Sequence, residues 1–232
     1  MKTLGLIGGM SWESTIPYYR QINETIKQHL GGLHSARIVL WSVDFQEIEA
    51  LQRSGQWEQA GQLLADAAQR LEAAGADALV LCTNTMHKVA PQITQAVHIP
   101  LLHIADPTAE AIKSAGLSCV GLLGTRFTME QDFYRERLIT QHGLDVLVPD
   151  EDDRETVHRI IYDELCLGQV HDASRAAYQA VIGRLVERGA QAIILGCTEI
   201  SLLIQPAHVG TPLFDTTHLH AVHAAKWALA SR

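Results

Sequence analysis

Two of the four cysteines, Cys82 and Cys197, stand at the ends of similar apolar segments and are each followed by threonine. The first lies in LVLCTNTMHK, residues 79–88, and the second in IILGCTEIS, residues 193–201. A thiol in such a turn can act as an acid/base group, although a cysteine at a strand end is more often a small buried apolar residue. The recurrence of the pattern favours a chemical role for these two, and the buried role suits Cys119 and Cys166.

Polar residues follow both cysteines: Thr83, Asn84 and Thr85 after the first, and Thr198 and Glu199 after the second. These residue types commonly cap a helix that begins there. Free backbone N–H groups and the positive end of the helix dipole then bind a carboxylate and lower the pKa of a nearby thiol. We therefore predict two carboxylate-binding turns with thiols of lowered pKa. His87 and Glu199 are also candidates for acid/base help, although a single such residue early in a helix is more often a cap or a solvated side chain.

The elements that must position these turns alternate along the chain. Short runs rich in Val, Ile and Leu, bounded by Gly, Pro or Thr, are typical of buried parallel strands. They are TLGLIGG, ARIVLWSV, ALVLCT, IPLLHI, CVGLLGT, LDVLVP, AIILGCT and TPLFDT. Helical spacing of apolar residues marks 14–30, 57–74, 129–142, 154–167, 174–188 and 219–230. This alternation predicts an α/β fold with parallel sheets.

An internal repeat divides the chain. GLIGGM at Gly5 resembles GLLGTR at Gly121, YYRQI resembles FYRERL, and GADALVLCT resembles GAQAIILGCT, each pair 114 to 116 residues apart. The cysteines are 115 apart. The repeat predicts two similar doubly wound domains related by pseudo-two-fold symmetry, with the active site in the cleft between them. We place residues 1–98 and 209–232, with Cys82, in the first domain and residues 99–208, with Cys197, in the second. IPLLHIADPTAEAI and TPLFDTTHLHAVHAA each end a half, and their strands and helices are candidates for crossing between domains.

Two thiols on opposite sides of one small substrate would suit inversion of a carbon stereocentre. Ligands of doubly wound sheets bind outside the carboxyl ends of the strands, where both cysteines are expected. One thiolate would remove the proton from one side of the carbon, and the other thiol would return a proton from the opposite side. The reverse reaction would exchange the two roles.

The motifs GLIGGMSWEST, CTNTMHK, LLGT and GCTEI, in this order from residue 5 to residue 200, resemble those of the aspartate/glutamate racemase family. The resemblance implies a two-domain α/β fold, amino-acid substrates, no pyridoxal phosphate or other cofactor, and Cys82 and Cys197 as the acid/base pair. It further implies that Asn84, Thr85 and Thr198 help to bind the α-carboxylate and ammonium groups. The loop with Met10 and Ser11 would close over the substrate, and Gln52 or Arg53 would be a further contact.

Some motifs depart from close relatives of this family. The chain has Met10 and Ser11 where cell-wall glutamate racemases have Asp-Ser-Gly, and GCTE where they have GCTH. The stretch ELCLG has Cys166 where some aspartate racemases carry a lysine that meets the distal carboxylate. A dedicated cell-wall enzyme is therefore not expected, and the preferred side chain, enantiomer and turnover stay open.

Composition and charge exclude several classes of partner. The formal charge of −8, without a basic stripe, argues against nucleic acid. No apolar run approaches the roughly 18–20 residues of a membrane span, and the N-terminus does not resemble a signal peptide, so we expect a cytoplasmic protein. GLIGGMS lacks the spacing of a dinucleotide-binding motif, and the cysteine spacing favours neither a disulfide framework nor a metal site.

Two alternatives to a racemase remain open from the sequence. One is an isomerase of related fold, such as a maleate isomerase, which keeps both cysteines. The other is a noncatalytic small-molecule sensor or thiol redox protein that uses the same cysteines. By analogy with the fold, we also expect a homo-oligomer, most simply a dimer.

Overall fold

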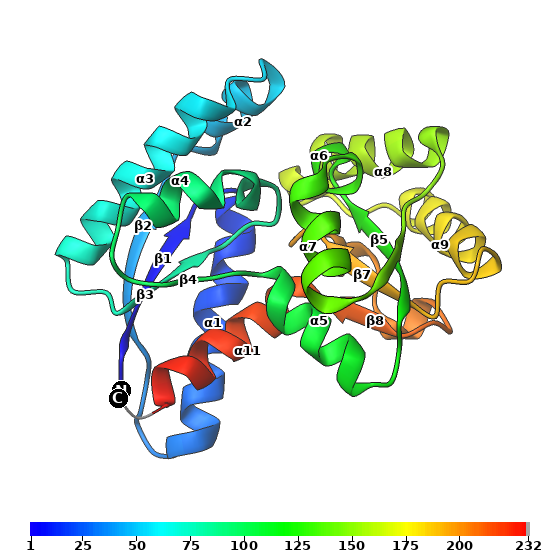
Figure 1. Cartoon of the computed structure of the whole chain (residues 1–232). Helices are drawn as coiled ribbons and strands as arrows, with labels where there is room; N and C mark the ends of the chain where they lie inside the picture. The colour runs from blue at the N-terminus through cyan, green and yellow to red at the C-terminus, as the bar shows by residue number, and fades with distance from the viewer. Residues whose placement is uncertain (231–232) are drawn as a thin grey trace. The chain divides into compact units, whose positions relative to one another are not determined.

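A computed structural model describes residues 1–230, which divide into two compact units. The first comprises residues 1–103 and the segment from His220 onward, and the second comprises residues 104–219. Each unit is built on its own four-stranded parallel sheet, and all of the strands except β6 are labelled in Figure 1. The α/β class and the parallel sheets predicted from the sequence are confirmed.

The sheet of the first unit has the strand order β2-β1-β3-β4. Its strands are β1 (Thr3–Gly8), β2 (Arg37–Ser42), β3 (Ala78–Leu81) and β4 (Leu101–Leu102). Its helices are α1 (Trp12–Leu30), α2 (Phe45–Arg53), α3 (Trp57–Ala73), the 3-10 helix η1 (Thr85–Val89) and α4 (Ala90–Gln95). All neighbouring strands pair in parallel, so their carboxyl ends gather at one edge of the sheet.

The second unit repeats this order as β6-β5-β7-β8. Its strands are β5 (Cys119–Gly124), β6 (Asp145–Leu147), β7 (Ala192–Gly196) and β8 (Leu213–Asp215). Its helices are α5 (Ala105–Ser114), α6 (Arg126–Glu130), α7 (Asp132–His142), α8 (Glu151–Asp163), α9 (Asp172–Glu187) and α10 (Ile200–Leu203), with 3-10 helices η2 (Leu165–Leu167) and η3 (Pro206–His208). The internal repeat is therefore a repeat of topology.

The last helix, α11 (Thr216–Leu229), begins in the second unit and continues into the first from His220. In the same way β4 belongs to the first sheet, whereas α5, which follows it, belongs to the second unit. The unit boundaries lie after residues 103 and 219, and not after 98 and 208 as the sequence suggested. The reason is strand pairing, because β4 pairs with β3 and β8 pairs with β7.

Alternation along each central strand directs side chains to two separate cores. In the first unit Val80 and Cys82 face the core formed with α1 and α11, whereas Leu79 and Leu81 face the core formed with α3. In the second unit Ile194 faces α5 and α7, whereas Ile193, Leu195 and Cys197 face α8 and α9. Burial of both faces explains why these strands read as continuous apolar runs.

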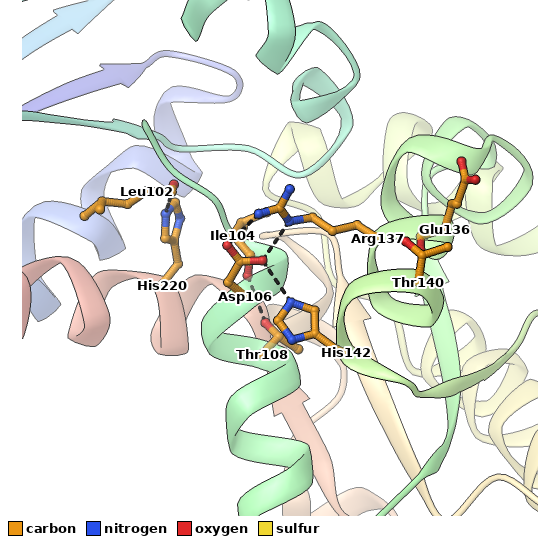
Figure 2. A network of polar contacts seen from close by, with 9 residues as sticks. All are labelled: Leu102, Ile104, Asp106, Thr108, Glu136, Arg137, Thr140, His142 and His220. Carbon is orange, nitrogen blue, oxygen red and sulfur yellow. Dashed lines mark hydrogen bonds and ion pairs between the residues drawn. The ribbon is translucent and has the colours of Figure 1, made fainter. Parts of the chain in front are cut away.

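A charged network joins two helices of the second unit. Asp106, in the first turn of α5, accepts hydrogen bonds of 2.7 and 2.8 Å from the Arg137 guanidinium on α7, as Figure 2 shows. His142, the last residue of α7, lies with Nε2 3.0 Å from the same carboxylate. Burial raises the pKa of Asp106, but these hydrogen bonds and charges outweigh it and leave the pKa below its ordinary value. The network therefore ties the start of α5 to the end of α7.

Candidate active site

In the first unit, the predicted site residues gather at the carboxyl edge of the sheet. Met10 follows β1 and is buried in the same core cluster as Met86, which belongs to the turn after β3. Gly9 makes the turn possible, because its φ is 92° and a Cβ there would lie 2.3 Å from the Val43 carbonyl oxygen. Ser11 then caps α1 by accepting a hydrogen bond from the Ser14 amide at 3.3 Å.

Gln52 and Arg53 lie at the end of α2, a helix that the sequence analysis did not predict. The Gln52 side chain is buried and its Nε2 lies 2.9 Å from the Met86 sulfur. The Arg53 side chain is 73% exposed and pairs with Glu49 on its own helix. Of the two, only Gln52 is directed toward the turn after β3.

The turn after β3 holds Thr83, Asn84 and Thr85, all of them buried. Asn84 occupies the cap position of η1, and no side-chain capping bond is made there. The Thr83 carbonyl accepts a hydrogen bond of 2.8 Å from Nδ1 of His87, which closes the turn. His87 therefore serves the backbone of this turn, a contact that the sequence did not indicate.

In the second unit, Cys197 lies at the carboxyl end of β7 beside a buried carboxylate. Its thiol donates to Oε2 of Glu199 at 3.0 Å, and the Thr198 hydroxyl donates to the same oxygen at 2.5 Å. Cys197 is 8% exposed and Glu199 is 3% exposed. Glu199 holds the cap position of α10 but makes no side-chain capping bond there. Its carboxylate instead accepts hydrogen bonds from the Cys197 thiol and the Thr198 hydroxyl.

The prediction that both thiols have a lowered pKa is wrong for this structure. Burial raises the pKa of the Cys82 thiol. Burial first, and then the negative charge of Glu199, hold the pKa of Cys197 well above its ordinary value. The helices that follow are short, five residues in η1 and four in α10, so little dipole offsets this desolvation. Both thiols are therefore protonated in the resting protein at neutral pH.

The register of the sheets also shows that Cys82 and Cys197 do not occupy equivalent positions. Gly5 of β1 pairs with Leu79, and Gly121, its counterpart in β5, pairs with Ile193. When both strands are continued by three or four residues, Cys82 is equivalent to Gly196 in the other repeat, and Thr83 is equivalent to Cys197.

The cores agree with this register. Cys82 is fully buried and faces the core of α1 and α11. Cys197 faces the core of α8 and α9, which in the repeat corresponds to the core formed with α3 and not to that of α1 and α11. The interpretation of the cysteines as a matched pair is wrong, and the signal was present, because GADALVLCT and GAQAIILGCT align without a gap to give the same result.

Tyr178 of α9 is a further residue near Cys197 that the sequence analysis missed. It is fully buried, and its hydroxyl donates to the Val157 carbonyl at 3.1 Å. Burial and the charges of Cys197 and Glu164 raise the pKa of Tyr178. The sequence gave no sign that Tyr178 lies near Cys197, because Tyr178 stands among the apolar residues of a predicted helix.

Neither a cluster of metal-binding side chains nor a membrane-spanning helix is present among the described residues. Within residues 1–230, no group of three or more His, Cys, Asp or Glu side chains could hold a metal ion. No described helix combines the length and apolar character that a membrane crossing requires.

Comparison with known proteins gives a consistent assignment. The model of the Asp/Glu/hydantoin racemase family matches residues 7–224. A solved structure from Yersinia pestis that carries a provisional Asp/Glu racemase assignment is 60% identical, with a TM-score of 0.92 over 99% of this chain and 100% of that one. An aspartate racemase homologue from Pyrococcus horikoshii OT3 is 32% identical, with a TM-score of 0.85 over 99% and 100%. The broad specificity amino-acid racemase RacX of Bacillus subtilis is 22% identical over 92% of both chains.

Proposed function

Because the chain belongs to the Asp/Glu/hydantoin racemase family, we propose that it is an amino-acid racemase that inverts the α-carbon without pyridoxal phosphate. The names of its relatives support an amino-acid substrate, with an acidic side chain or a broader set. The observation that carries the proposal is the Cys197 thiol held 3.0 Å from the Glu199 carboxylate in a buried turn.

Cys197 is proposed as one of the two acid/base groups. Because its pKa is raised, the resting thiol is ready to donate a proton to an α-carbanion. Donation leaves a thiolate, which can remove the α-proton of a new substrate of the opposite hand. The electron pair left on the α-carbon is delocalised into the substrate carboxylate. Glu199 can accept the thiol proton when the thiolate form is needed, because the two groups already share a hydrogen bond.

The remaining predicted contacts belong to substrate binding. Asn84 and Thr85 in the first unit, and Thr198 in the second, are proposed to bind the α-carboxylate and ammonium groups. Met10 and Gln52 are proposed to contact the rest of the substrate, since both are packed with Met86 beside the turn after β3.

The group that serves the opposite side of the α-carbon is assigned to the end of β3. The two-thiol form of the mechanism uses Cys82, a thiol whose side chain is directed into the core and whose pKa is raised by burial. The form based on the repeat uses Thr83, whose position is equivalent to that of Cys197. The two forms share the reaction and differ in a single residue.

Deuterium exchange tests the function directly. Single enantiomers from a panel of amino acids are incubated in D2O without added cofactor. We expect α-deuteration and loss of optical rotation for at least one of them, with loss of optical rotation abolished in Cys197→Ala and retained in the matched variant Cys119→Ala. Exchange in no member of the panel, or dependence on added pyridoxal phosphate, would contradict the proposal.

We also propose an assembly and a cell compartment for the protein. We propose a homodimer in a reducing compartment such as the cytoplasm, where the four free cysteines stay reduced. Light scattering should give about twice the 25.5 kDa mass of one chain. A single species at the monomer mass would contradict the dimer.

A further inference from the structure

The turn after β3 leaves the sheet with a backbone that needs its own support. The Thr83 amide donates to the Leu81 carbonyl at 2.9 Å, and the His87 amide donates to the Asn84 carbonyl at 3.0 Å. The Thr83 carbonyl is buried with its residue, and a buried carbonyl requires a donor. That donor is the His87 ring at 2.8 Å.

The chemistry of this contact fixes the His87 proton. A carbonyl oxygen can only accept, so Nδ1 of His87 carries the hydrogen. The bond joins a side chain to the carbonyl four residues earlier and encloses Thr83, Asn84, Thr85 and Met86. It therefore spans the residues that the proposed function assigns to acid/base chemistry and to substrate binding.

The His87 ring is itself held on its other sides. It is 2% exposed and meets the His103 ring edge to face, with ring centroids 4.4 Å apart. The His220 ring lies 6.0 Å away. Nε2 of His220 donates to the Leu102 carbonyl at 2.8 Å, as Figure 2 shows, and its Nδ1 lies 2.9 Å from the Tyr18 hydroxyl. Because the carbonyl fixes the proton on Nε2, the Tyr18 hydroxyl donates to Nδ1 in the neutral ring.

These contacts form a chain of support within the first unit. α1, β4 and α11 fix His220, the packed rings restrict His87, and His87 fixes the Thr83 carbonyl. A group held in this way loses little freedom when a substrate binds, which is the property that an acid/base turn needs. The arrangement buries several polar groups, and the hydrogen bonds of His87 and His220 provide partners for them.

From this geometry we infer that His87 is a positioning residue for the turn of residues 83–85, acting through the Thr83 carbonyl and without touching the substrate. The inference rests on the proposed function for its catalytic part. A merely structural His87 would stabilise the first unit and leave the turnover of folded enzyme unchanged.

Two substitutions separate these readings. His87→Asn places an amide nitrogen at the same distance along the side chain as Nδ1 and keeps the donor. His87→Leu has a similar size and removes the donor. Leu71→Ala, a buried residue of α3 that lies beside Gly5 of β1, is the control for simple loss of stability.

Steady-state racemisation gives the first measurement. We expect His87→Leu to lower kcat per folded enzyme by about 100-fold, as a small displacement of a reacting group does. His87→Asn should stay within several-fold of wild type, and Leu71→Ala should lower the melting temperature with kcat unchanged. Wild-type kcat in folded His87→Leu, or equal losses in the Asn and Leu variants, would overturn the inference.

Hydrogen exchange of the peptide covering residues 82–90 gives a second measurement that needs no activity. Relative to a peptide from α1, this peptide should exchange faster in His87→Leu than in wild type, with His87→Asn close to wild type. Unchanged exchange in His87→Leu would overturn the inference. If the wild-type protein racemises no amino acid, the proposed function fails, and the exchange result still decides whether His87 holds the turn.

Discussion

At the scale of single residues, the second-unit site is organised by one carboxylate. Oε2 of Glu199 accepts hydrogen bonds from the Cys197 thiol and from the Thr198 hydroxyl. A buried negative charge beside a thiol makes the thiolate less stable, so the cysteine keeps its proton. In the proposed mechanism, this arrangement favours proton donation by the resting thiol, and the carboxylate is the proton acceptor when the thiol must act as a base.

Substitution of Glu199 should therefore raise the reactivity of the Cys197 thiol toward iodoacetamide and lower the rate of racemisation. In Glu199→Gln the charge is lost, so the pKa of Cys197 should fall toward its ordinary value, although burial still holds it above that value. The midpoint of the rate of Cys197 alkylation by iodoacetamide against pH, followed by mass spectrometry, should move down. Racemisation should fall by roughly 10²-fold or more, because a proton acceptor is lost.

The control for this prediction is Thr198→Val, which removes the second hydrogen bond and keeps the charge. Its alkylation midpoint should stay close to that of wild type. An unchanged midpoint in Glu199→Gln would show that burial alone sets the pKa of the thiol.

The sequence predicted where the two turns lie and not how their side chains are oriented. Residue types identified the turns at Cys82 and Cys197, because Cys, Thr and Asn after an apolar run are recognisable locally. The raised thiol pKa values come from burial by distant helices, and the role of His87 comes from a ring packed among His103 and His220. Such effects depend on tertiary contacts, which a local pattern does not contain.

At the scale of elements, the strands were predictable and the short helices were not. All eight predicted strands are present, and the central strands β1, β3, β5 and β7 are buried on both faces, which leaves a continuous apolar run. The helices α2, α4, α6 and α10 have four to nine residues, too few for a helical period to stand out. The predicted segment 129–142 is divided between α6 and α7, with Gln131 in extended conformation between them.

The pairing of α5 with α7 gives a prediction for stability against pH. Because the folded pKa of Asp106 lies below its ordinary value of 3.8, its stabilisation is complete above that pH and is lost as pH falls through the folded value. Asp106→Asn should lower the free energy of unfolding by about 1–2 kcal/mol at pH 7, discounted for partial exposure. The difference from wild type should shrink below about pH 4.

Thermal unfolding from pH 7 to pH 3 measures this difference. Asp132→Asn, an exposed carboxylate on α7 that pairs with Arg135 at 3.4 Å, is the matched control and should have little effect at any pH. A difference between wild type and Asp106→Asn that grows on acidification would show that the network does not favour the charged form of Asp106.

At the scale of the whole molecule, the repeat explains the architecture and corrects the reading of the cysteines. Both sheets have the same strand order, and in each unit the third strand along the chain, β3 or β7, ends at a turn that we propose to carry acid/base chemistry. After a duplication, selection can preserve the geometry of the turn in both units while the residue at the equivalent position changes. Position 83 has a hydroxyl where position 197 has a thiol.

This non-equivalence leads to a test of which residue serves the face opposite Cys197. Thr83→Ala, Cys82→Ala and Cys197→Ala are compared for racemisation and for α-deuteration of each enantiomer in D2O. Because register and burial favour position 83, we expect Thr83→Ala to slow racemisation by roughly 10²–10⁴-fold and Cys82→Ala to have a much smaller effect.

The enantiomer that each variant still processes identifies the face of the α-carbon that the remaining group serves. With the group at β3 removed, Cys197 can still take the proton from the enantiomer that faces it, so Thr83→Ala should keep elimination of hydrogen chloride from one enantiomer of a β-chloro amino acid. Cys197→Ala should lose that reaction with the same enantiomer. If Cys82→Ala, and not Thr83→Ala, abolishes racemisation while sparing this elimination, the two-thiol form is correct and the Cys82 side chain must leave the core during the reaction. If neither variant at β3 slows racemisation, the second proton-transfer group lies outside this turn.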